Sequence, residues 1–477
     1  MTEFFGSVWW LLVTLGLLIT FHEYGHYLAG RLCGVKVLRF SIGLGKPFWR
    51  RTDRHGTEFA VAPIPLGGYV KFLDEREEEV PAQLRAQAFN NKSLGQRTVI
   101  VAAGPAANLL FALVAFWAMY LVGKQDFMPV VGQVDGIAAE AGVQTGDRLL
   151  SIDGVAVDTW THAALQLITA GVDRRAVPIQ VTGGDGDTRS LQLDLDRLPA
   201  DVREPQMLFA AGLIPRHLTR APVIGQVPAD LPAANAGLLP GDVILAVGGQ
   251  PVQTWNQVPG LIQQLASAPA DNVAGIDASD DGALAPVTTL ATGDAASIVF
   301  SIQRDGRQLQ VPVQPAAVTD ADGERRFQVG IGVDPSPYDY DALLRFGPVK
   351  AMAAAGRETW TMTSATVGML WRMVAGRASV ENLSGPISIS RYANASARSG
   401  LAHFLWFLGV ISLSLCIINL LPIPILDGGH LLYYLIELIK GSPVSEGVMV
   451  VGQYIGLVLL AGLMGLAFYN DIARLFS

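Results

Sequence analysis

The sequence predicts a polytopic α-helical membrane protein with four transmembrane helices and a tandem pair of β-rich domains inserted between helices two and three. Three observations predict this class. Half of the 477 residues are hydrophobic and 16% are charged, whereas a soluble domain carries about 25% charged residues. Four runs free of Asp, Glu, Lys and Arg are long enough to cross a bilayer. A segment of different composition lies between the second and third runs, and it repeats itself.

The four apolar runs are each about 17 residues or longer, the length that a helix needs to cross the hydrocarbon core. We expect the transmembrane helices at about residues 4–28, 99–123, 401–426 and 448–470. A fifth run, 359–371, has only about 13 residues, which is too short to span. We therefore assign the region 340–400 to amphipathic segments that lie in the membrane interface.

Loop charge predicts the orientation of these helices. The loop 31–97 holds twelve Lys or Arg, whereas the residues before the first run include none. Because basic loops remain in the cytoplasm, this loop is expected inside the cell. Both termini and the segment between the second and third helices are then expected outside.

The overall charge and the cysteines exclude other classes of protein. Lys and Arg total 34 and Asp and Glu total 42, which gives a net charge of −8. An acidic chain is a poor ligand for a nucleic-acid backbone, so we expect no nucleic-acid partner. The two cysteines, Cys33 and Cys416, cannot form a disulfide framework, and we interpret them as packing residues.

The segment 127–335 contains two copies of one pattern. Residues 141–147 (AGVQTGD) recur at 236–242 (AGLLPGD), and Trp160 recurs as Trp255, each 95 residues further on. Alternating strands follow in both copies. We expect two β-rich domains, 127–220 and 221–335, the second with an insertion at 267–293 that has no counterpart in the first.

The repeated turn and strand resemble those of PDZ domains of the bacterial periplasmic type. Such domains bind extended peptides by adding them to a sheet edge. The alternative is a rigid spacer that binds nothing.

His22, Glu23 and His26 form an HExxH motif at the inner end of the first predicted helix. Histidines four residues apart share one helix face and lie about 6 Å apart along its axis. Both imidazoles can therefore bind one Zn²⁺, with Glu23 as the general base for a water molecule. Placing an ionisable group within a membrane span costs about 2.5 kcal/mol or more of insertion free energy. Three such groups therefore require a compensating partner. The alternative is a pair of helix-end histidines that face water.

Asp427 is the candidate for the third zinc ligand, because catalytic zinc usually has three protein ligands and one open position. Apart from Glu23, it is the only acidic residue at the inner end of an apolar run. His22 lies about 18 residues into the first predicted helix and Asp427 about 24 residues into the third, so both reach the same side of the bilayer. His430 is a rival ligand, but it follows the end of the apolar run.

Pro422 and Pro424 break the third helix just before Asp427. Irregular backbone at this depth is tolerated only inside protein or along a watery cavity. Asn419 is therefore a candidate for holding the substrate backbone or a developing oxyanion, or for a helix–helix hydrogen bond. In the second helix, we interpret Gly104 and Asn108 as a close helix contact with a structural role.

The loop 31–97 contains alternating residues punctuated by glycines, which predicts a small β-hairpin folded toward the membrane. We place Gly43 and Tyr69 on this hairpin as candidate substrate-binding residues, since its edge could hold a substrate strand. The alternative is a plain cytoplasmic hairpin.

These motifs resemble one family, the intramembrane site-2 metalloproteases. HExxH together with the distant N-x-x-P-x-P-x-x-D-G, which starts here at Asn419, is specific for that family. The resemblance implies zinc held by His22, His26 and Asp427, with Glu23 as the base.

It also implies a bacterial inner-membrane enzyme with periplasmic PDZ domains. The implied substrate is a single-pass membrane protein, typically an anti-sigma factor in envelope-stress signalling, which is cut within its span after another protease has trimmed it. The PDZ pair would restrict untrimmed substrates.

Two other classes compete with the enzyme reading. A catalytically inactive membrane scaffold that presents two PDZ domains would not need four ionisable groups within the membrane. A metal transporter needs polar residues along several helices, and the second and fourth offer little beyond Asn108, Gln453 and Tyr454.

Overall fold

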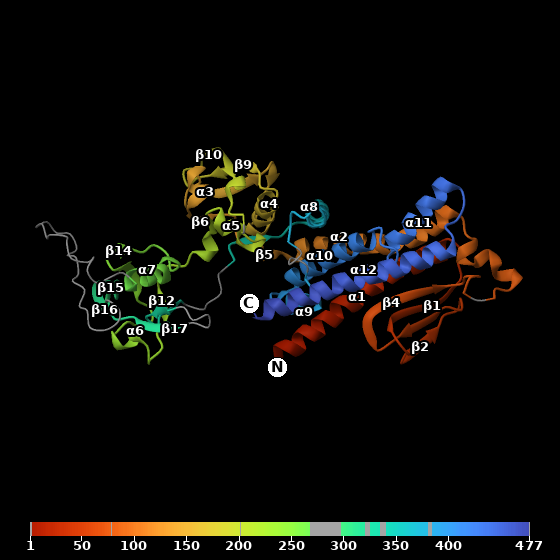
Figure 1. Cartoon of the computed structure of the whole chain (residues 1–477), viewed down its shortest axis with the longest axis horizontal. Coiled ribbons are helices and arrows are strands. Elements are labelled where there is room, and N and C mark those ends of the chain that lie inside the picture. Colours follow the sequence, from red (N-terminus) through yellow and green to blue (C-terminus); the bar gives the residue numbers. More distant parts are fainter. Residues whose placement is uncertain are drawn as a thin grey trace, which may run out of the picture. The chain divides into compact units, whose positions relative to one another are not determined.

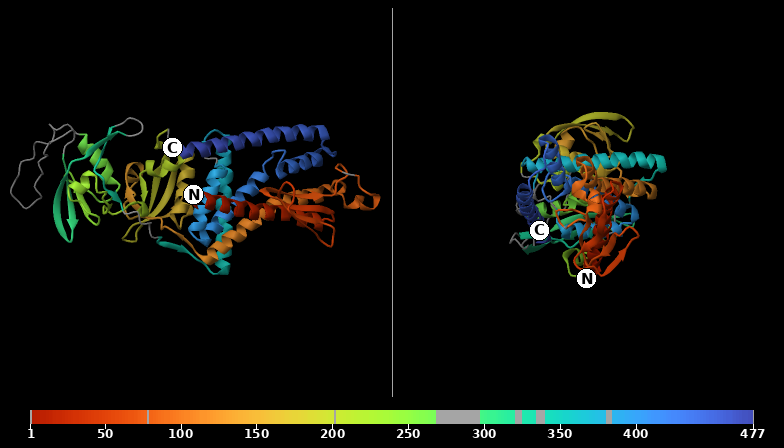
Figure 2. Two further views of the ribbon diagram at one scale, coloured as in Figure 1. Left: turned by 90° about the horizontal axis from the view of Figure 1, so that it is seen from below. Right: turned by 90° about the vertical axis from the view of Figure 1, so that its right-hand side faces the viewer.

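The computed structural model describes residues 2–77, 79–200, 202–267, 297–319, 325–333, 340–379 and 384–476. The chain divides into two compact units, one made of Met1–Asp126 and Ala342–Ser477 and the other of Phe127–Asp341. The predicted insertion 267–293 lies outside the described residues, apart from Ser267. Figures 1 and 2 show both units.

Within the described residues of the first unit, four helices are long and apolar enough to cross a membrane. They are α1 (Thr2–Leu32), α2 (Leu94–Val122), α10 (Leu401–Asn419) and α12 (Glu446–Phe476). The two chain ends lie at the same end of this helical unit (Figures 1 and 2). α2 begins at a capping box made by Ser93 and Gln96, and it packs against both α1 and α10. The predicted polytopic helical class is confirmed.

α10 is shorter than the apolar run that predicted it. The helix ends at Asn419, so the expected extent of 401–426 is wrong at its C-terminal end. Pro422 and Pro424 explain the difference, because proline cannot donate the backbone hydrogen bond that continues a helix. The chain restarts as α11 (Asp427–Lys440), a helix that the sequence analysis did not predict.

The start of α11 is packed tightly against the preceding loop. A Cβ atom on Gly428 would lie 2.2 Å from the Leu421 carbonyl oxygen, and one on Gly429 would lie 2.4 Å from that of Ile423. Only glycine fits at these two positions. The loop therefore folds back on the first turn of α11 and fixes where the helix begins.

The region 340–400 forms two further helices, α8 (Pro348–Val374) and α9 (Pro386–Arg398). α8 extends on both sides of the short run that predicted an interfacial segment. Its alanines 351, 354 and 355 are buried in a cluster with α2 and α10 side chains. Glu358 of α8 is also buried, and it accepts hydrogen bonds from Tyr120 (3.2 Å) and Trp406 (3.0 Å).

The loop between α1 and α2 is a four-stranded sheet rather than a plain hairpin. Its strands are β1 (Val37–Leu44), β2 (Trp49–Thr52), β3 (Glu58–Val61) and β4 (Ile64–Phe72), in the order β2-β3-β1-β4. β1 runs parallel to β3 and antiparallel to β4. β4 is an edge strand and packs on α1 (Figure 1).

In the second unit, the sequence repeat is also a structural repeat. The first copy has the sheet order β10-β9-β7-β8 and the second β16-β15-β13-β14, which is the same order in equivalent strands. The strands of the first sheet are β7 (Arg148–Ile152), β8 (Val155–Ala156), β9 (Ala176–Thr182) and β10 (Thr188–Asp194). Those of the second are β13 (Val243–Val247), β14 (Gln250–Pro251), β15 (Ile298–Arg304) and β16 (Arg307–Val313). Equivalent helices are α4 (Trp160–Val172) and α7 (Gln257–Ala266).

Each copy also contains the same buried ion pair. Asp147 accepts hydrogen bonds from Arg189 at 2.5 Å, and Asp242 accepts them from Arg304 at 2.6 Å. Burial alone would raise the pKa of Asp242, but the hydrogen bonds from Arg304 and from the Leu239 backbone hold it below its ordinary value. The aspartate of the repeated G-D turn therefore ties that turn to a distant strand.

Shorter elements complete the two units. The remaining strands are β5 (Lys124–Asp126), β6 (Val131–Val134), β11 (Leu213–Pro215), β12 (Ile224–Gln226), β17 (Ala316–Thr319), β18 (Arg325–Gln328), β19 (Gly332–Val333) and β20 (Ala342–Leu344). The remaining helices are α3 (Gly136–Glu140), α5 (Met207–Ala210) and α6 (Pro232–Asn235), with short 3-10 turns between elements.

Candidate metal centre

α1 places the two histidines of the HExxH motif side by side. Because α1 is continuous from Thr2 to Leu32, residues four apart share one face. The His22 and His26 rings meet edge to face with centroids 4.8 Å apart. Their Nε2 atoms are 3.2 Å apart.

Asp427, the first residue of α11, completes a group of three ligand atoms. Its Oδ2 lies 3.3 Å from His22 Nε2 and 3.5 Å from His26 Nε2. Ligands at about 2.0–2.1 Å around a tetrahedral zinc ion lie about 3.3–3.4 Å from one another. Oδ2 is also buried, with no hydrogen-bond partner in the described chain. The donor set therefore fits zinc in both chemistry and spacing.

Among the described residues, this is the one group of three or more His, Cys, Asp or Glu side chains that converge closely enough to bind a metal ion. The structure thus brings together His22, His26 and Asp427, although 400 residues separate the last two.

α2 holds the second nitrogen of each imidazole. His26 Nδ1 lies 2.9 Å from the Ile100 carbonyl oxygen, which can only accept, so Nδ1 carries the proton. Asn108 Nδ2 lies 3.2 Å from His22 Nδ1, while Asn108 Oδ1 is buried without a partner in the described chain. A half-turn of the amide lets Oδ1 accept a proton from His22 Nδ1. Both Nε2 lone pairs then point toward Asp427.

Two glycines allow α1 and α2 to approach this closely. A Cβ atom on Gly25 would lie 2.2 Å from the Ala103 carbonyl oxygen, and one on Gly104 would lie 2.2 Å from His26 Nε2. Any larger residue at Gly104 would therefore displace the His26 imidazole.

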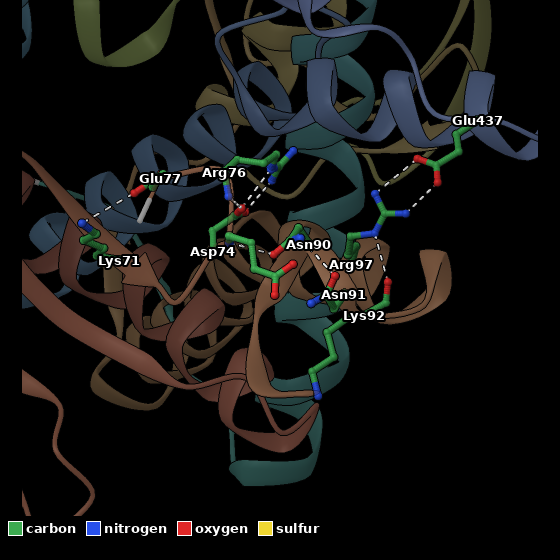
Figure 3. A network of polar contacts seen from close by, with 10 residues as sticks. Lys71, Asp74, Arg76, Glu77, Asn90, Asn91, Lys92, Arg97 and Glu437 are labelled. Carbon is green, nitrogen blue, oxygen red and sulfur yellow. Dashed lines mark hydrogen bonds and ion pairs between the residues drawn. The ribbon is translucent and has the colours of Figure 1, made fainter. Parts of the chain in front are cut away.

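α2 also holds α11, through an ion pair near the start of α2 (Figure 3). Arg97 donates two hydrogen bonds to Glu437, at 2.6 and 3.2 Å, and both side chains are mostly buried. The Arg97 guanidinium also lies 5.1 Å from the ring centroid of Tyr434. The helix that carries Asp427 is thus fixed to the helix that orients the histidines.

Glu23 faces the edge strand β4. A Cβ atom on Gly68 would lie 3.0 Å from Glu23 Cγ, and the Glu23 carboxylate accepts a hydrogen bond from the Val70 backbone. His22, His26 and Asp427 lie close to this carboxylate. The carboxylate therefore lies close both to the three candidate ligand residues and to the backbone of β4.

The other predicted site residues lie outside the three-residue cluster. Asn419 is the partly exposed last residue of α10, and His430 lies one turn beyond Asp427, with its ring against Tyr433. Gly43 has a φ of +87° in β1, and a Cβ there would lie 2.5 Å from the Ala62 carbonyl oxygen. The Tyr69 hydroxyl accepts a hydrogen bond from Arg39.

Asn108 is a site contact that the sequence analysis missed, since it was assigned a structural role. The available signal was an amide inside an apolar run, which a helix–helix contact explains equally well.

Membrane-spanning helices that bring an HExxH pair together with a distant aspartate define a metallopeptidase of the membrane. The sequence profile of Peptidase family M50 matches residues 10–463. The chain belongs to this family, whose members depend on zinc.

Relatives match along nearly the whole chain. A protein of Xylella fastidiosa strain 9a5c named "Putative zinc metalloprotease" is 44% identical over 474 residues, covering 99% of this chain and 100% of the relative. "Regulator of sigma-E protease RseP" of Escherichia coli K12 is 40% identical over 479 residues, covering 100% of both. The protein of that name in Salmonella typhimurium 14028s is 39% identical over 468 residues, covering 97% and 98%.

Proposed function

We propose that this protein is a zinc endopeptidase that cleaves the transmembrane segment of a single-pass protein after another protease has trimmed it. The observation that carries the proposal is the convergence of three ligand atoms, 3.2 to 3.5 Å apart, beside Glu23. The names of the relatives support an anti-sigma factor as the substrate, because two of them are named "Regulator of sigma-E protease RseP".

In this proposal, His22, His26 and Asp427 hold the metal ion. Bound zinc supplies a Lewis acid that polarises the peptide carbonyl and acidifies water. Ile100 and Asn108 keep the imidazoles in the tautomer that binds through Nε2.

Glu23 acts as the general base. Its carboxylate takes the proton from the attacking water and passes it to the leaving amide nitrogen, so it is regenerated in each cycle. The Val70 backbone orients this carboxylate.

β4 holds the substrate backbone in this proposal. It is an edge strand, so the outer side of its backbone, apart from the Val70 N–H that Glu23 binds, can pair with an extended segment of substrate. Unfolding the substrate helix into a strand exposes its peptide bonds to Glu23. Gly43 and Tyr69 of this sheet and Asn419 at the end of α10 are the proposed substrate-binding residues.

The second unit acts as a pair of PDZ domains that restrict which substrates approach. Its two repeated sheets support this assignment. The basic loop 31–97 supports an inner-membrane orientation with that loop in the cytoplasm and with the repeats and both termini in the periplasm.

The proposal is tested with purified protein, zinc and a fluorogenic peptide that spans a detergent micelle. The wild type is expected to cleave the peptide, and Glu23→Gln is expected to lose at least about 100-fold in rate, the size of a general-base contribution. Zinc content should stay equal in the two proteins, because the ligands remain. If the wild type binds zinc but does not cleave the peptide, the protein is better explained as a membrane scaffold without catalytic activity. If the Glu23→Gln variant remains active, Glu23 is not the general base.

A further inference from the structure

The sheet between α1 and α2 has a second edge strand, β2, which lies opposite the edge formed by β4. The strand order β2-β3-β1-β4 places β3 and β1 between these two edges (Figure 1). β4 packs on α1, whereas all four residues of β2, Trp49–Thr52, are exposed. The outer edge of the sheet therefore presents its side chains to the surroundings of the protein.

The contacts of β4 with α1 show how the sheet lies along that helix. A Cβ atom on Gly30 would lie 2.3 Å from the Phe72 ring, and one on Gly68 would lie 3.0 Å from Ile19 Cγ2. β4 therefore runs antiparallel to α1. β2 runs in the same direction as β4, because β2 is antiparallel to β3, β3 is parallel to β1, and β1 is antiparallel to β4. β2 thus begins at the level of the middle of α1 and ends toward the C-terminus of α1.

Exposed apolar side chains gather where the sheet lies nearest the middle of α1. They are Leu44, Phe48, Trp49 and Ile64, each at least 41% exposed. Leu44 pairs with Ile64 across β1 and β4, and Trp49 pairs with Val61 at the corresponding end of β2 and β3. α1 is one of the helices that are long and apolar enough to cross a membrane. This end of the sheet therefore lies at a depth where lipid chains surround it.

Exposed basic side chains follow on the same strand and in the turns at its ends. They are Lys46, Arg50, Arg51 and Arg54. Within the described part of the chain, none of the four forms an ion pair or a side-chain hydrogen bond. Two acidic residues lie in the sequence between Trp49 and Val61. Asp53 pairs with Arg31 at 3.8 Å, and Glu58 pairs with Arg39 at 2.9 Å. The positive charge of the strand is therefore not compensated by these carboxylates.

The order of side chains along β2 matches the profile of a membrane surface. Phe48 and Trp49 come first, nearest the middle of α1, and Arg50 and Arg51 follow them. Arg54 lies in the turn beyond the strand, beside the end of α1. Aromatic rings favour the boundary between acyl chains and headgroups, and long basic side chains reach outward from the apolar region. A guanidinium group can bind a phosphate through two parallel hydrogen bonds.

We propose that residues 44–54, which we call the β2 patch, bind the surface of a bilayer that contains anionic phospholipid. Phe48 and Trp49 lie among the acyl chains, and Arg50 and Arg51 bind the headgroup phosphates. In the proposed orientation, this end of α1 lies at the cytoplasmic face, whose anionic lipids attract basic segments. The patch lies at the opposite edge of the sheet from β4, so it is distinct from the metal centre and from the proposed substrate strand.

The test uses the full-length protein in nanodiscs made of equal amounts of phosphatidylglycerol and phosphatidylcholine, with brominated acyl chains on one lipid or on the other. Bromine quenches nearby tryptophan, and the signal of Trp49 is the part of the emission that Trp49→Phe removes. Each arginine near an anionic surface favours the anionic lipid about fivefold. In the wild type, the two quenching signals are therefore expected to show phosphatidylglycerol enriched at least about fivefold beside Trp49.

Charge reversal at the two arginines should remove this enrichment. Arg50→Glu combined with Arg51→Glu is expected to bring the local ratio of the two lipids to about one or below. Arg50→Lys combined with Arg51→Lys keeps the charge and should retain most of the enrichment. Arg307→Glu, which changes an exposed arginine of β16, is the control and should match the wild type.

Three results would overturn the proposal in proteins whose melting temperature is unchanged. If neither lipid quenches Trp49, the patch lies outside the bilayer. If both lipids quench it equally in the wild type, the patch enters lipid without selecting anionic headgroups. If the enrichment survives reversal of both arginines, Arg50 and Arg51 do not select the lipid. An unquenched Trp49 together with binding of a polyglutamate peptide, lost on reversal of both arginines, would assign the patch to an acidic protein instead.

Discussion

At the residue scale, the tautomer of each histidine decides whether this site can bind zinc. An imidazole that binds through Nε2 must carry its proton on Nδ1, and a buried Nδ1–H needs an acceptor. The Ile100 carbonyl supplies that acceptor for His26, and Asn108 can supply it for His22. The backbone carbonyl cannot be removed by mutation, so Asn108 is the contact through which this effect can be measured.

We predict that Asn108→Ala weakens zinc binding by about 10- to 100-fold, the range found when the partner of a metal-binding histidine is removed. The measurement is competition with a chelator of known affinity. Ser412→Ala is the control, because its hydroxyl donates to the Asn108 backbone oxygen at 2.8 Å and makes no contact with His22. Equal losses in both variants would show that general packing, and not the acceptor, matters.

We predict that Asp427→Asn loses peptide cleavage and releases zinc, because the amide is a weak ligand compared with the carboxylate. His430→Ala should retain both zinc and activity, since His430 lies outside the cluster of ligand atoms. Metal analysis of both purified variants checks the assignment. Zinc lost from His430→Ala but kept by Asp427→Asn would make His430 the third ligand.

The candidate ligands could be named from the sequence, whereas the contacts that support them could not. HExxH encodes its own geometry through helical spacing, and Asp427 stood out as an acidic residue at the depth of His22. Asn108 gives no such signal, because an amide in an apolar helix fits a helix–helix contact equally well. Only its distance from His22 Nδ1 distinguishes the two roles.

At the element scale, the position of α11 places Asp427, the candidate third ligand, beside the two histidines. The sequence indicated a helix break at Pro422 and Pro424, but α11 itself was missed, because residues 427–440 mix apolar and charged side chains and follow an apolar run without a typical capping residue. The four-stranded sheet was likewise expected only as a hairpin, since the parallel pairing of β1 with β3 is non-local. Long-range contacts such as these leave little trace in local periodicity.

We predict that the Arg97–Glu437 pair controls zinc affinity by holding α11 (Figure 3). Arg97→Ala and Glu437→Ala should each weaken zinc binding about tenfold, because each leaves a partly buried charge without its partner. The combined exchange Arg97→Glu with Glu437→Arg should restore most of the loss.

A control for this experiment is Glu77→Ala. Glu77 forms an ion pair with Lys71 at 3.6 Å, and both are exposed, so its loss should change zinc affinity little. Failure of the exchange to restore zinc affinity, with the melting temperature unchanged, would contradict the positioning role.

At the scale of the whole molecule, the second unit is an insertion with closely spaced ends. β5 pairs antiparallel with β20, and Asp126 lies directly opposite Ala342. The chain therefore leaves the first unit before Phe127 and returns to it after Asp341 at adjacent positions. That point comes just after the end of α2. Val122, the last residue of α2, lies about 27 Å along the helix axis from Gly104, which packs against His26.

We predict that replacing Phe127–Asp341 by a two-residue Asn-Gly turn, which fits an antiparallel pair, leaves hydrolysis of a trimmed substrate intact. The same variant should cut an untrimmed substrate that the intact protein resists, because the proposed gate is lost. The measurement is the ratio of cleavage rates for trimmed and untrimmed forms of one substrate in both proteins. An equal ratio with and without the insertion would leave the repeats as a spacer.

The separation of His26 and Asp427 in the sequence also determines when, during synthesis, both residues are present in the chain. At a synthesis rate of about 5–20 residues per second, the 400 residues between them take about 20 to 80 seconds to emerge. Throughout this interval the nascent chain carries both histidines and Glu23 but lacks the third donor atom. A chain released early by a stalled ribosome lacks α11 as well, so under the proposed ligand assignment unfinished copies could not complete the zinc site in the membrane.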